Sequence, residues 1–126
     1  MIEITVFFEF EENKDEWIVF AEKFEKWLNE KGVKSNSLER LIEKFGSLKN
    51  WVDFCFNNSD ADFWVAVYAI CLTTRSRKTL SKLNEWIKEN HYESKYYLRN
   101  KNGSRMGMDL DELFEWSDER KKRNQI

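Results

Sequence analysis

The chain has 126 residues, of which 41% are hydrophobic, 16% aromatic and 35% charged, and these proportions are typical of a single globular domain. Its 21 basic and 23 acidic residues give a net charge of −2, which excludes a strongly basic nucleic-acid clamp and a densely acidic DNA mimic. Two Cys, one His, four Gly and no Pro exclude a disulfide scaffold, a Cys/His zinc site and a Gly-rich phosphate loop. We predict one compact domain over residues 1–126.

The expected location is the cytoplasm. No apolar run reaches the roughly 18–20 residues that a membrane span requires. The first residues, Met1 to Ile4, lack the basic and then apolar segments of a signal peptide. Cys55 and Cys71 lie in apolar runs, which predicts reduced thiols in the core. We therefore expect no membrane contact.

The N-terminal third predicts a strand followed by a helix. Apolar and polar residues alternate from Ile2 to Phe10, with Phe7 on the otherwise polar face, and this period of two indicates a strand with one buried face. Asn13 can cap the helix that follows, and Gly32 can close it in the left-handed conformation.

The middle of the chain is less clear. A short helix is predicted between a cap at Asn36 and a stop at Gly46. Residues 48–56 fit both a helix and a strand, and we favour a strand from Trp51 because turn-forming residues follow it. The nearly continuous apolar run over 63–72 indicates a central strand buried on both faces.

The C-terminal part predicts a helix that Ser76 or Thr74 opens and that ends at Asn90, followed by a hairpin over 95–108. A final helix is predicted from Asp109 onward, with Glu112 as the partner in its capping box. Asn102 and Gly103 form a two-residue turn signal within the hairpin. The resulting element order predicts an α+β fold with an antiparallel sheet and helices packed on one face. Its core is a ferredoxin-like βαββαβ plan with an inserted short helix and a C-terminal helix.

Aromatic side chains are expected on the uncovered face of this sheet. In the predicted pairing Trp64 and Tyr68 join Phe7, and carboxylates surround them. RNA-recognition modules stack bases on such a face, but their basic-Gly-aromatic run is missing over 62–68, and Glu3 and Glu9 on the same face would repel phosphate. The extra helices could instead cover this face as core. An aromatic face with a charged rim suits a protein partner. The predicted anchors are Phe7, Trp64 and Tyr68, and the predicted rim is Glu3, Glu9 and Glu11.

Positive charge and further aromatics are concentrated between Thr73 and Arg105. This segment holds nine basic residues against three Glu, interleaved with one Trp and three Tyr. Phosphate neutralisation combined with stacking is the chemistry of single-stranded nucleic-acid and nucleotide-phosphate binding. The residues predicted for this alternative are Arg75, Arg77, Lys78, Arg99, Arg105 and Tyr97. A solvated helix face with an ordinary hairpin would also explain the segment.

Catalysis is weakly supported. His91 suits a helix end, and Asp60 and Asp62 suit a turn better than a metal site. We expect no catalytic residue, no metal and no cofactor, although a small enzyme using these groups stays a third hypothesis. In size and composition the chain is similar to immunity proteins, antitoxins and phage-encoded inhibitors. The leading hypothesis is a non-catalytic monomer or homodimer that occludes another protein, and the alternative partner is a nucleic acid.

Overall fold

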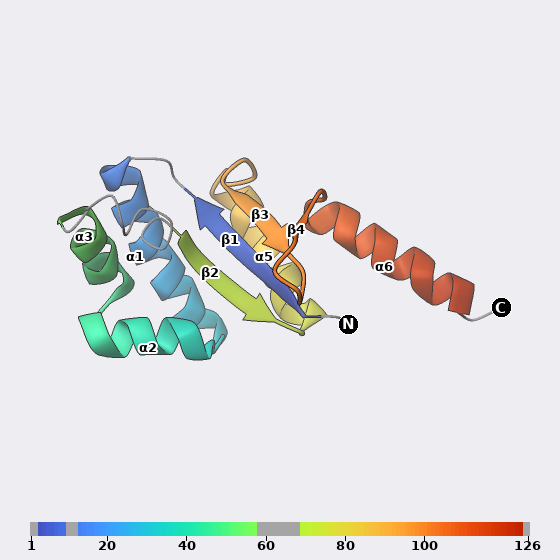
Figure 1. The fold of residues 1–126 in the computed structure, drawn as a ribbon, viewed down its shortest axis with the longest axis horizontal. Helices are drawn as coiled ribbons and strands as arrows, with labels where there is room; N and C mark the ends of the chain where they lie inside the picture. The colour runs from blue at the N-terminus through green and yellow to red at the C-terminus, as the bar shows by residue number, and fades with distance from the viewer. Residues whose placement is uncertain (1–2, 10–12, 58–68, 125–126) are drawn as a thin grey trace. The chain divides into compact units, whose positions relative to one another are not determined.

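The computed structural model describes residues 3–9, 13–57 and 69–124 (Figure 1). Over these ranges it contains five helices and a four-stranded antiparallel sheet with the strand order β2-β1-β3-β4, so the predicted α+β class is confirmed. The chain clusters into two compact units. The helical unit is Phe8–Leu72, and the sheet unit is Met1–Phe7 with Thr73–Ile126.

Strand β1, Ile4–Glu9, shows the alternation that the sequence predicts. Ile4, Val6 and Phe8 are fully buried, whereas Thr5 and Phe7 on the opposite face are partly exposed. The period of two in the strand therefore separates a core face from an open face, and Phe7 lies on the open face as predicted.

Helix α1, Lys14–Lys31, begins and ends as predicted. The Asn13 side chain accepts a hydrogen bond of 3.2 Å from the Glu16 N–H. At the other end Gly32 adopts φ +63°, and the Val33 N–H donates to the Leu28 carbonyl at 2.9 Å. This pair of features is a Schellman closure, which satisfies carbonyls that the helix leaves unpaired.

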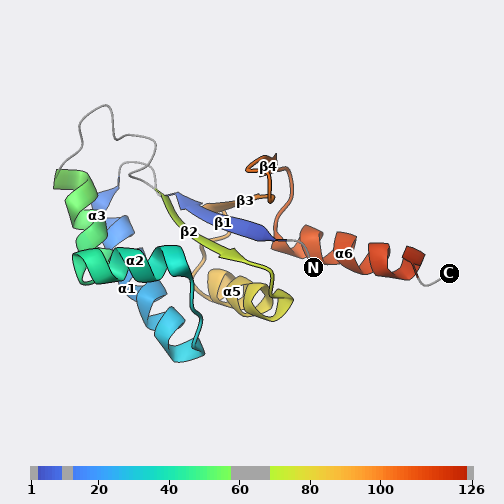
Figure 2. The same ribbon diagram turned by 60° about the horizontal axis from the view of Figure 1, so that its bottom comes forward.

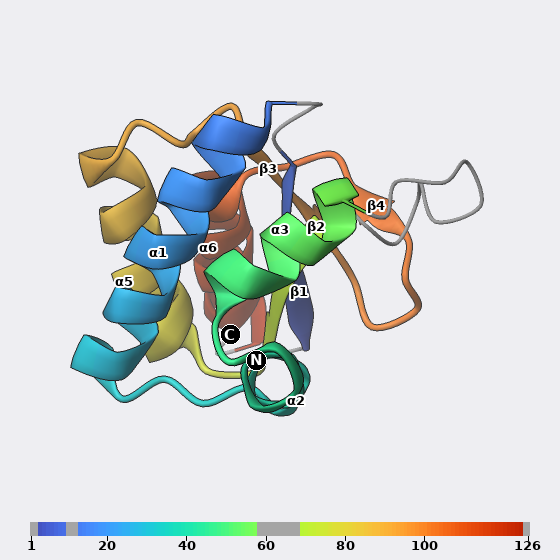
Figure 3. The same ribbon diagram turned by 90° about the vertical axis from the view of Figure 1, so that its left-hand side faces the viewer.

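The core of the helical unit is aromatic. Phe20 and Phe24 of α1 stack at 5.3 Å between ring centroids, and the Phe8 ring lies 4.7 and 5.4 Å from them. All three side chains are fully buried. Figure 3 shows α1 beside α3, Leu48–Asn57, which is its main helical neighbour. Aromatic rings bury large areas each, so a short unit can build a substantial core.

Helix α2, Asn36–Phe45, is capped one residue earlier than predicted. Ser35 has the extended backbone of a cap, and the Glu39 N–H donates to the Ser35 carbonyl at 2.8 Å. Asn36 is thus the first helical residue, and the choice of Asn36 as cap was wrong. The Ser35 hydroxyl does not cap the helix and lies 3.2 Å from the Ser37 hydroxyl.

The strand favoured from Trp51 was wrong, because residues 48–57 form the helix α3. Leu48, Val52 and Cys55 are buried at helical spacing. Two side-chain oxygens start the helix: Ser47 Oγ accepts from the Asn50 N–H at 3.0 Å, and Glu25 Oε1 accepts from the Leu48 N–H at 2.7 Å. Satisfying these otherwise unpaired donors favours the helix over the strand.

The ferredoxin-like strand order is not confirmed. The second strand of that plan is replaced by α3, and the described sheet ends in β2, Ala69–Thr74, on one side and in β4, Arg105–Met106, on the other. The strand predicted over 63–72 lies partly outside the described residues, and its described part continues to Thr74. As predicted, this strand lies beside β1.

In the sheet unit, helix α5, Arg77–Glu89, starts at a Ser76 cap whose hydroxyl accepts from the Thr79 N–H at 3.2 Å. Its apolar stripe is fully buried, and so is Leu98 of β3, Tyr96–Arg99. The fully buried aliphatic side chains of this unit are Ile4, Val6, Leu80, Leu83, Ile87, Leu98, Leu110 and Leu113. The core of this unit is therefore aliphatic, in contrast to the aromatic core of the helical unit.

Helix α6, Leu110–Asn124, continues beyond the strands of its unit (Figure 2). Its start is fixed twice: Asp109 Oδ1 accepts from the Glu112 N–H at 2.9 Å, as predicted, and Tyr96 Oη accepts from the Leu110 N–H at 3.1 Å. Burial and the nearby carboxylates raise the pKa of Tyr96, so its hydroxyl stays neutral.

Candidate functional site

The open face of the sheet unit is built by alternate residues of neighbouring strands. On β3, Leu98 is buried, so Tyr97 and Arg99 lie on the opposite face. On β1 this face carries Thr5, Phe7 and, at the end of the strand, Glu9. The Thr5 and Thr73 hydroxyls lie 2.8 Å apart and form a hydrogen bond between β1 and β2 on this face.

Two aromatic rings meet at the centre of this face. The rings of Phe7 and Tyr97 are stacked, with centroids 5.2 Å apart and planes inclined by 8°. Both residues are partly exposed, so the stack forms part of the surface. Cross-strand aromatic pairs of this kind stabilise a sheet and hold each ring in one orientation.

Two arginines lie against these rings. The guanidinium carbon of Arg99 is 4.4 Å from the Phe7 centroid and 5.4 Å from the Tyr97 centroid, and its Nη2 donates to Tyr97 Oη at 3.1 Å. The guanidinium carbon of Arg105 is 4.4 Å from the Tyr97 centroid. Phe7, Tyr97, Arg99 and Arg105 are hereafter the arginine–aromatic cluster.

Arg99 and Arg105 also face each other directly, because they are register partners in the antiparallel β3–β4 pair. Among the residues that the structure describes, neither has a carboxylate within ion-pair distance. A guanidinium has five N–H donors, and Arg99 uses one of them on Tyr97. With respect to the described residues, the cluster therefore presents two positive charges, and most of their N–H donors make no hydrogen bond there.

The β3–β4 turn holds Arg105 in this position. The predicted two-residue turn was wrong: the Asn100 N–H donates to the Ser104 carbonyl at 3.0 Å, which leaves a three-residue loop. Gly103 takes φ +81° in it, a left-handed conformation that suits Gly at the end of such a loop. Asn100 Oδ1 accepts from the Asn102 and Ser104 N–H groups, each at 3.0 Å.

The other predicted basic residues are arranged differently. Arg75 is exposed and pairs through Nε with Glu3 Oε2 at 3.3 Å. Arg77 makes a bidentate contact with Asp118 of α6 and lies over the Phe114 ring. A carboxylate thus neutralises each of these two charges. Lys78 is exposed on α5, without an ion pair to any described residue.

The residues predicted for a protein partner are only partly described. Phe7 lies in the cluster, Glu3 is engaged by Arg75, and Glu9 is exposed at the end of β1. Trp64, Tyr68 and Glu11 lie outside the described residues. Sequence reasoning assigned Phe7 to one hypothesis and Tyr97, Arg99 and Arg105 to the other, whereas the structure brings these four together.

Those candidate catalytic residues that the structure describes do not come together in one site. His91 has φ 60° and its N–H donates to the Lys88 carbonyl at 3.2 Å, so it takes part in closing α5. Cys55 is buried, and burial raises the pKa of its thiol to about 12, which keeps it protonated. Asp60 and Asp62 lie outside the described residues.

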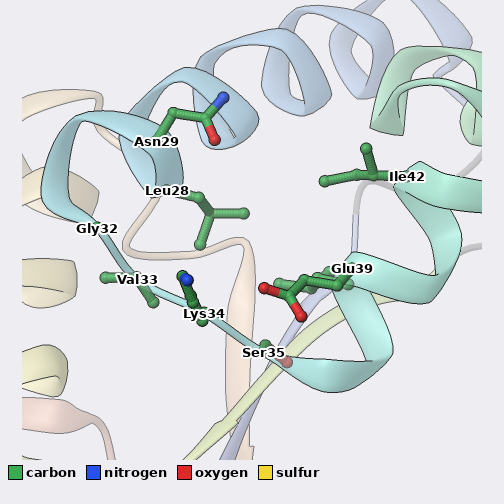
Figure 4. A pocket seen from close by; sticks show the side chains of 9 residues that line it. Leu28, Asn29, Gly32, Val33, Lys34, Ser35, Glu39 and Ile42 are labelled. Carbon is green, nitrogen blue, oxygen red and sulfur yellow. The ribbon is translucent and has the colours of Figure 1, made fainter.

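A small hollow lies between the end of α1 and the start of α2 (Figure 4). Its volume is about 190 Å³, and its lining includes Leu28 and Ile42 together with the polar Lys34 and Glu39. Pockets for small organic ligands usually measure about 300–1,000 Å³. The hollow is therefore a weaker candidate than the open face.

Comparison with known proteins finds no matching family model, no similar curated protein and no similar solved structure. Across the described ranges, none of the helices is both long and apolar enough to cross a lipid bilayer. Within the same ranges, no group of three or more His, Cys, Asp or Glu is placed to hold a metal ion.

Two carboxylates tie α6 to α5 and predict a pH effect. Asp111 accepts hydrogen bonds from Lys88 Nζ and from Asn84 Nδ2, and the Lys88 contact is the main reason that its pKa is lowered. The bond from Arg77 lowers the pKa of Asp118 in the same way. A lowered folded-state pKa means stability that is present above the unfolded pKa and lost as the pH falls through the folded pKa.

We therefore expect the unfolding temperature to fall from about pH 4, the ordinary aspartate range, toward lower pH. In the D111N/D118N variant this part of the pH dependence should disappear. Both carboxylates are exposed, so the effect will be modest because water screens such pairs. Thermal unfolding followed by circular dichroism from pH 7 downward measures it. Parallel curves for the two proteins would show that these ion pairs contribute nothing.

Proposed function

We propose that the protein binds single-stranded nucleic acid on the open face of its sheet, with the arginine–aromatic cluster as the centre of the site. The observation that carries this proposal is the pairing of Arg99 with Arg105. Like charges directly opposite each other destabilise a sheet, and no described carboxylate offsets them. An anionic ligand between the two guanidinium groups would turn this repulsion into binding energy.

The rings support the same proposal. Aromatic side chains stack on bases whatever the sequence, and guanidinium groups form paired hydrogen bonds to phosphate oxygens. Phe7 and Tyr97 hold the arginines in place without neutralising them. A side chain that is already ordered loses less entropy on binding, so this arrangement favours capture of a phosphate close to a base.

The size of the positive surface sets the expected strength. The whole chain carries a net charge of −2, and the cluster offers two cations that form no ion pair with a described residue. Each phosphate neutralised on a single strand contributes about −0.7 to the slope of log affinity against log salt. The cluster alone therefore predicts a slope of about −1.4, which is much shallower than that of a strongly basic binding protein.

The expectation of a protein partner stays a prediction. Its acidic rim is weakened where it is described, because Glu3 is paired with Arg75. Three of the six residues predicted for the protein partner, Trp64, Tyr68 and Glu11, lie outside the described ranges. The non-catalytic character of the chain and its single-domain organisation likewise stay predictions. An acidic protein could bind the same two arginines, so the test must separate it from a nucleic acid.

The direct test is fluorescence anisotropy with a labelled single strand of about 10 nucleotides, a length within the usual range of single-strand sites. We expect saturable binding with the shallow salt slope given above, and weaker binding of the same sequence as a duplex. A polyglutamate peptide should compete poorly, because it offers no base to stack. No binding at about 50 mM salt, or equal competition by the peptide, would contradict the proposal.

Tyr97→Leu separates stacking from charge. Removal of one stacking ring costs about 1–3 kcal/mol for a bound base, so the affinity should fall roughly 5- to 150-fold. The salt slope should stay unchanged, since both arginines remain. Val19→Leu, at an exposed position of α1, is the control variant. A changed slope with unchanged affinity at low salt would show that the ring only positions the arginines.

A further inference from the structure

A second positive surface lies at the far end of α6. Four consecutive residues of its last described turns are basic and exposed: Arg120, Lys121, Lys122 and Arg123. None of them forms an ion pair with any other part of the chain that the structure describes. Cations near a helix C-terminus are favourable to the helix dipole, and after the larger effect of Arg77, Lys121 and Lys122 also help to lower the pKa of Asp118.

The arrangement of these charges around the helix shows that they do not serve packing. Successive helical residues are about 100° apart, so four in a row point in all directions around the axis. No side of this segment is therefore apolar enough to lie against the rest of the unit. In Figure 2 this end of α6 stands clear of the strands of the sheet unit.

An exposed aromatic ring accompanies the charges. Trp116 is 38% exposed, and the guanidinium carbon of Arg120 lies 5.1 Å from its ring. The arginine–aromatic cluster shows the same combination, in which a cation contacts an aromatic ring and not a carboxylate. Asp118 lies between Trp116 and Arg120 in α6, and its bidentate contact with Arg77 attaches this part of the helix to α5. The exposed ring and its arginine are therefore held in a defined position.

We propose that this basic end of α6 is a second contact for the same nucleic-acid strand and binds phosphates beyond those at the cluster. The inference rests on the proposed function. The Leu110 N–H donates a hydrogen bond to the Tyr96 hydroxyl in β3, and the helix rises about 15 Å from Leu110 to Arg120. A regular polyanion is the partner that can reach both surfaces at once, because its charges repeat along its length.

The test compares a short and a long labelled strand, of about 4 and about 16 nucleotides, the limits of usual single-strand sites. In the K121Q/K122Q variant we expect roughly tenfold weaker binding of the long strand and a salt slope shallower by about 1.4. Binding of the short strand should equal that of the wild type. The matched control, K23Q/K31Q, removes two exposed lysines of α1 and should leave both affinities unchanged.

Each result decides one question. If the wild type binds neither strand, the proposed function is wrong and this inference ends with it. If the wild type binds both strands and K121Q/K122Q keeps full affinity for the long strand, only the second contact is wrong. The same holds if the control variant loses as much affinity as K121Q/K122Q, because the effect is then one of net charge.

Discussion

Arg105→Glu should weaken single-strand binding while leaving the protein as stable as before or more stable. The substitution places a carboxylate opposite Arg99 in the β3–β4 register, so a repulsive cross-strand pair becomes an attractive one. Opposite charges in such a pair contribute about 0.2–1 kcal/mol. A charge-assisted hydrogen bond to a phosphate is worth about 1.5–3 kcal/mol, so we expect affinity to fall at least about tenfold.

The opposite directions of the two effects make this prediction sharp. Replacing a residue that supports the fold makes the protein less stable. Replacing a residue that serves binding often makes the protein more stable. Thermal unfolding and anisotropy titrations on the same preparation measure both. Lys23→Glu, at an exposed position of α1, is the matched charge reversal and should change neither. Lower stability with unchanged affinity would assign Arg105 to the hairpin and remove it from the site.

Local signals in the sequence were sufficient for most helix boundaries. Asn13 and Asp109 were predicted to start helices, and Ser76 was one of two candidates for a third start; each accepts a backbone N–H bond at its helix. These bonds join residues three apart, so the information lies within one turn of the chain. Gly32 closes α1 for the same reason, since the left-handed conformation at that position depends on the residue itself.

Contacts between distant segments decided what the sequence left open. Residues 48–56 carried both periodicities, and the carboxylate that starts α3 belongs to Glu25, 23 positions earlier. The candidate site depends on a longer separation still, because Phe7 stacks on Tyr97 only when β1 and β3 are neighbours. The sequence had singled out Phe7 and, separately, Tyr97 with Arg99 and Arg105. Only the strand order shows that they lie together on one face.

The largest loss of stability is expected from Phe24→Ala. The Phe24 ring is fully buried and lies 5.3 to 5.9 Å from the rings of Phe8, Phe20 and Trp27. Truncation of a buried phenylalanine costs about 3–5 kcal/mol, because transfer energy and packing are lost together. Natural domains are stable by about 5–15 kcal/mol, so a large share of the folding free energy would be lost.

The same variant tests whether the chain behaves as one domain. The boundary between the helical and sheet units falls inside two strands, between Phe7 and Phe8 of β1 and between Leu72 and Thr73 of β2. Because the backbone hydrogen bonds of one strand belong to a single ladder, we expect the two parts of such a strand to unfold together. We therefore expect Phe24→Ala to lower a single transition, in tryptophan fluorescence and in circular dichroism alike.

Val19→Ala on the same helix provides the control, because Val19 is 48% exposed and its loss should cost little. Two transitions, of which Phe24→Ala shifts only one, would show that the units unfold independently and that the single-domain prediction is wrong. In that case the sheet unit would keep its unfolding temperature. Its oligonucleotide affinity would also persist, since all four residues of the arginine–aromatic cluster belong to the sheet unit.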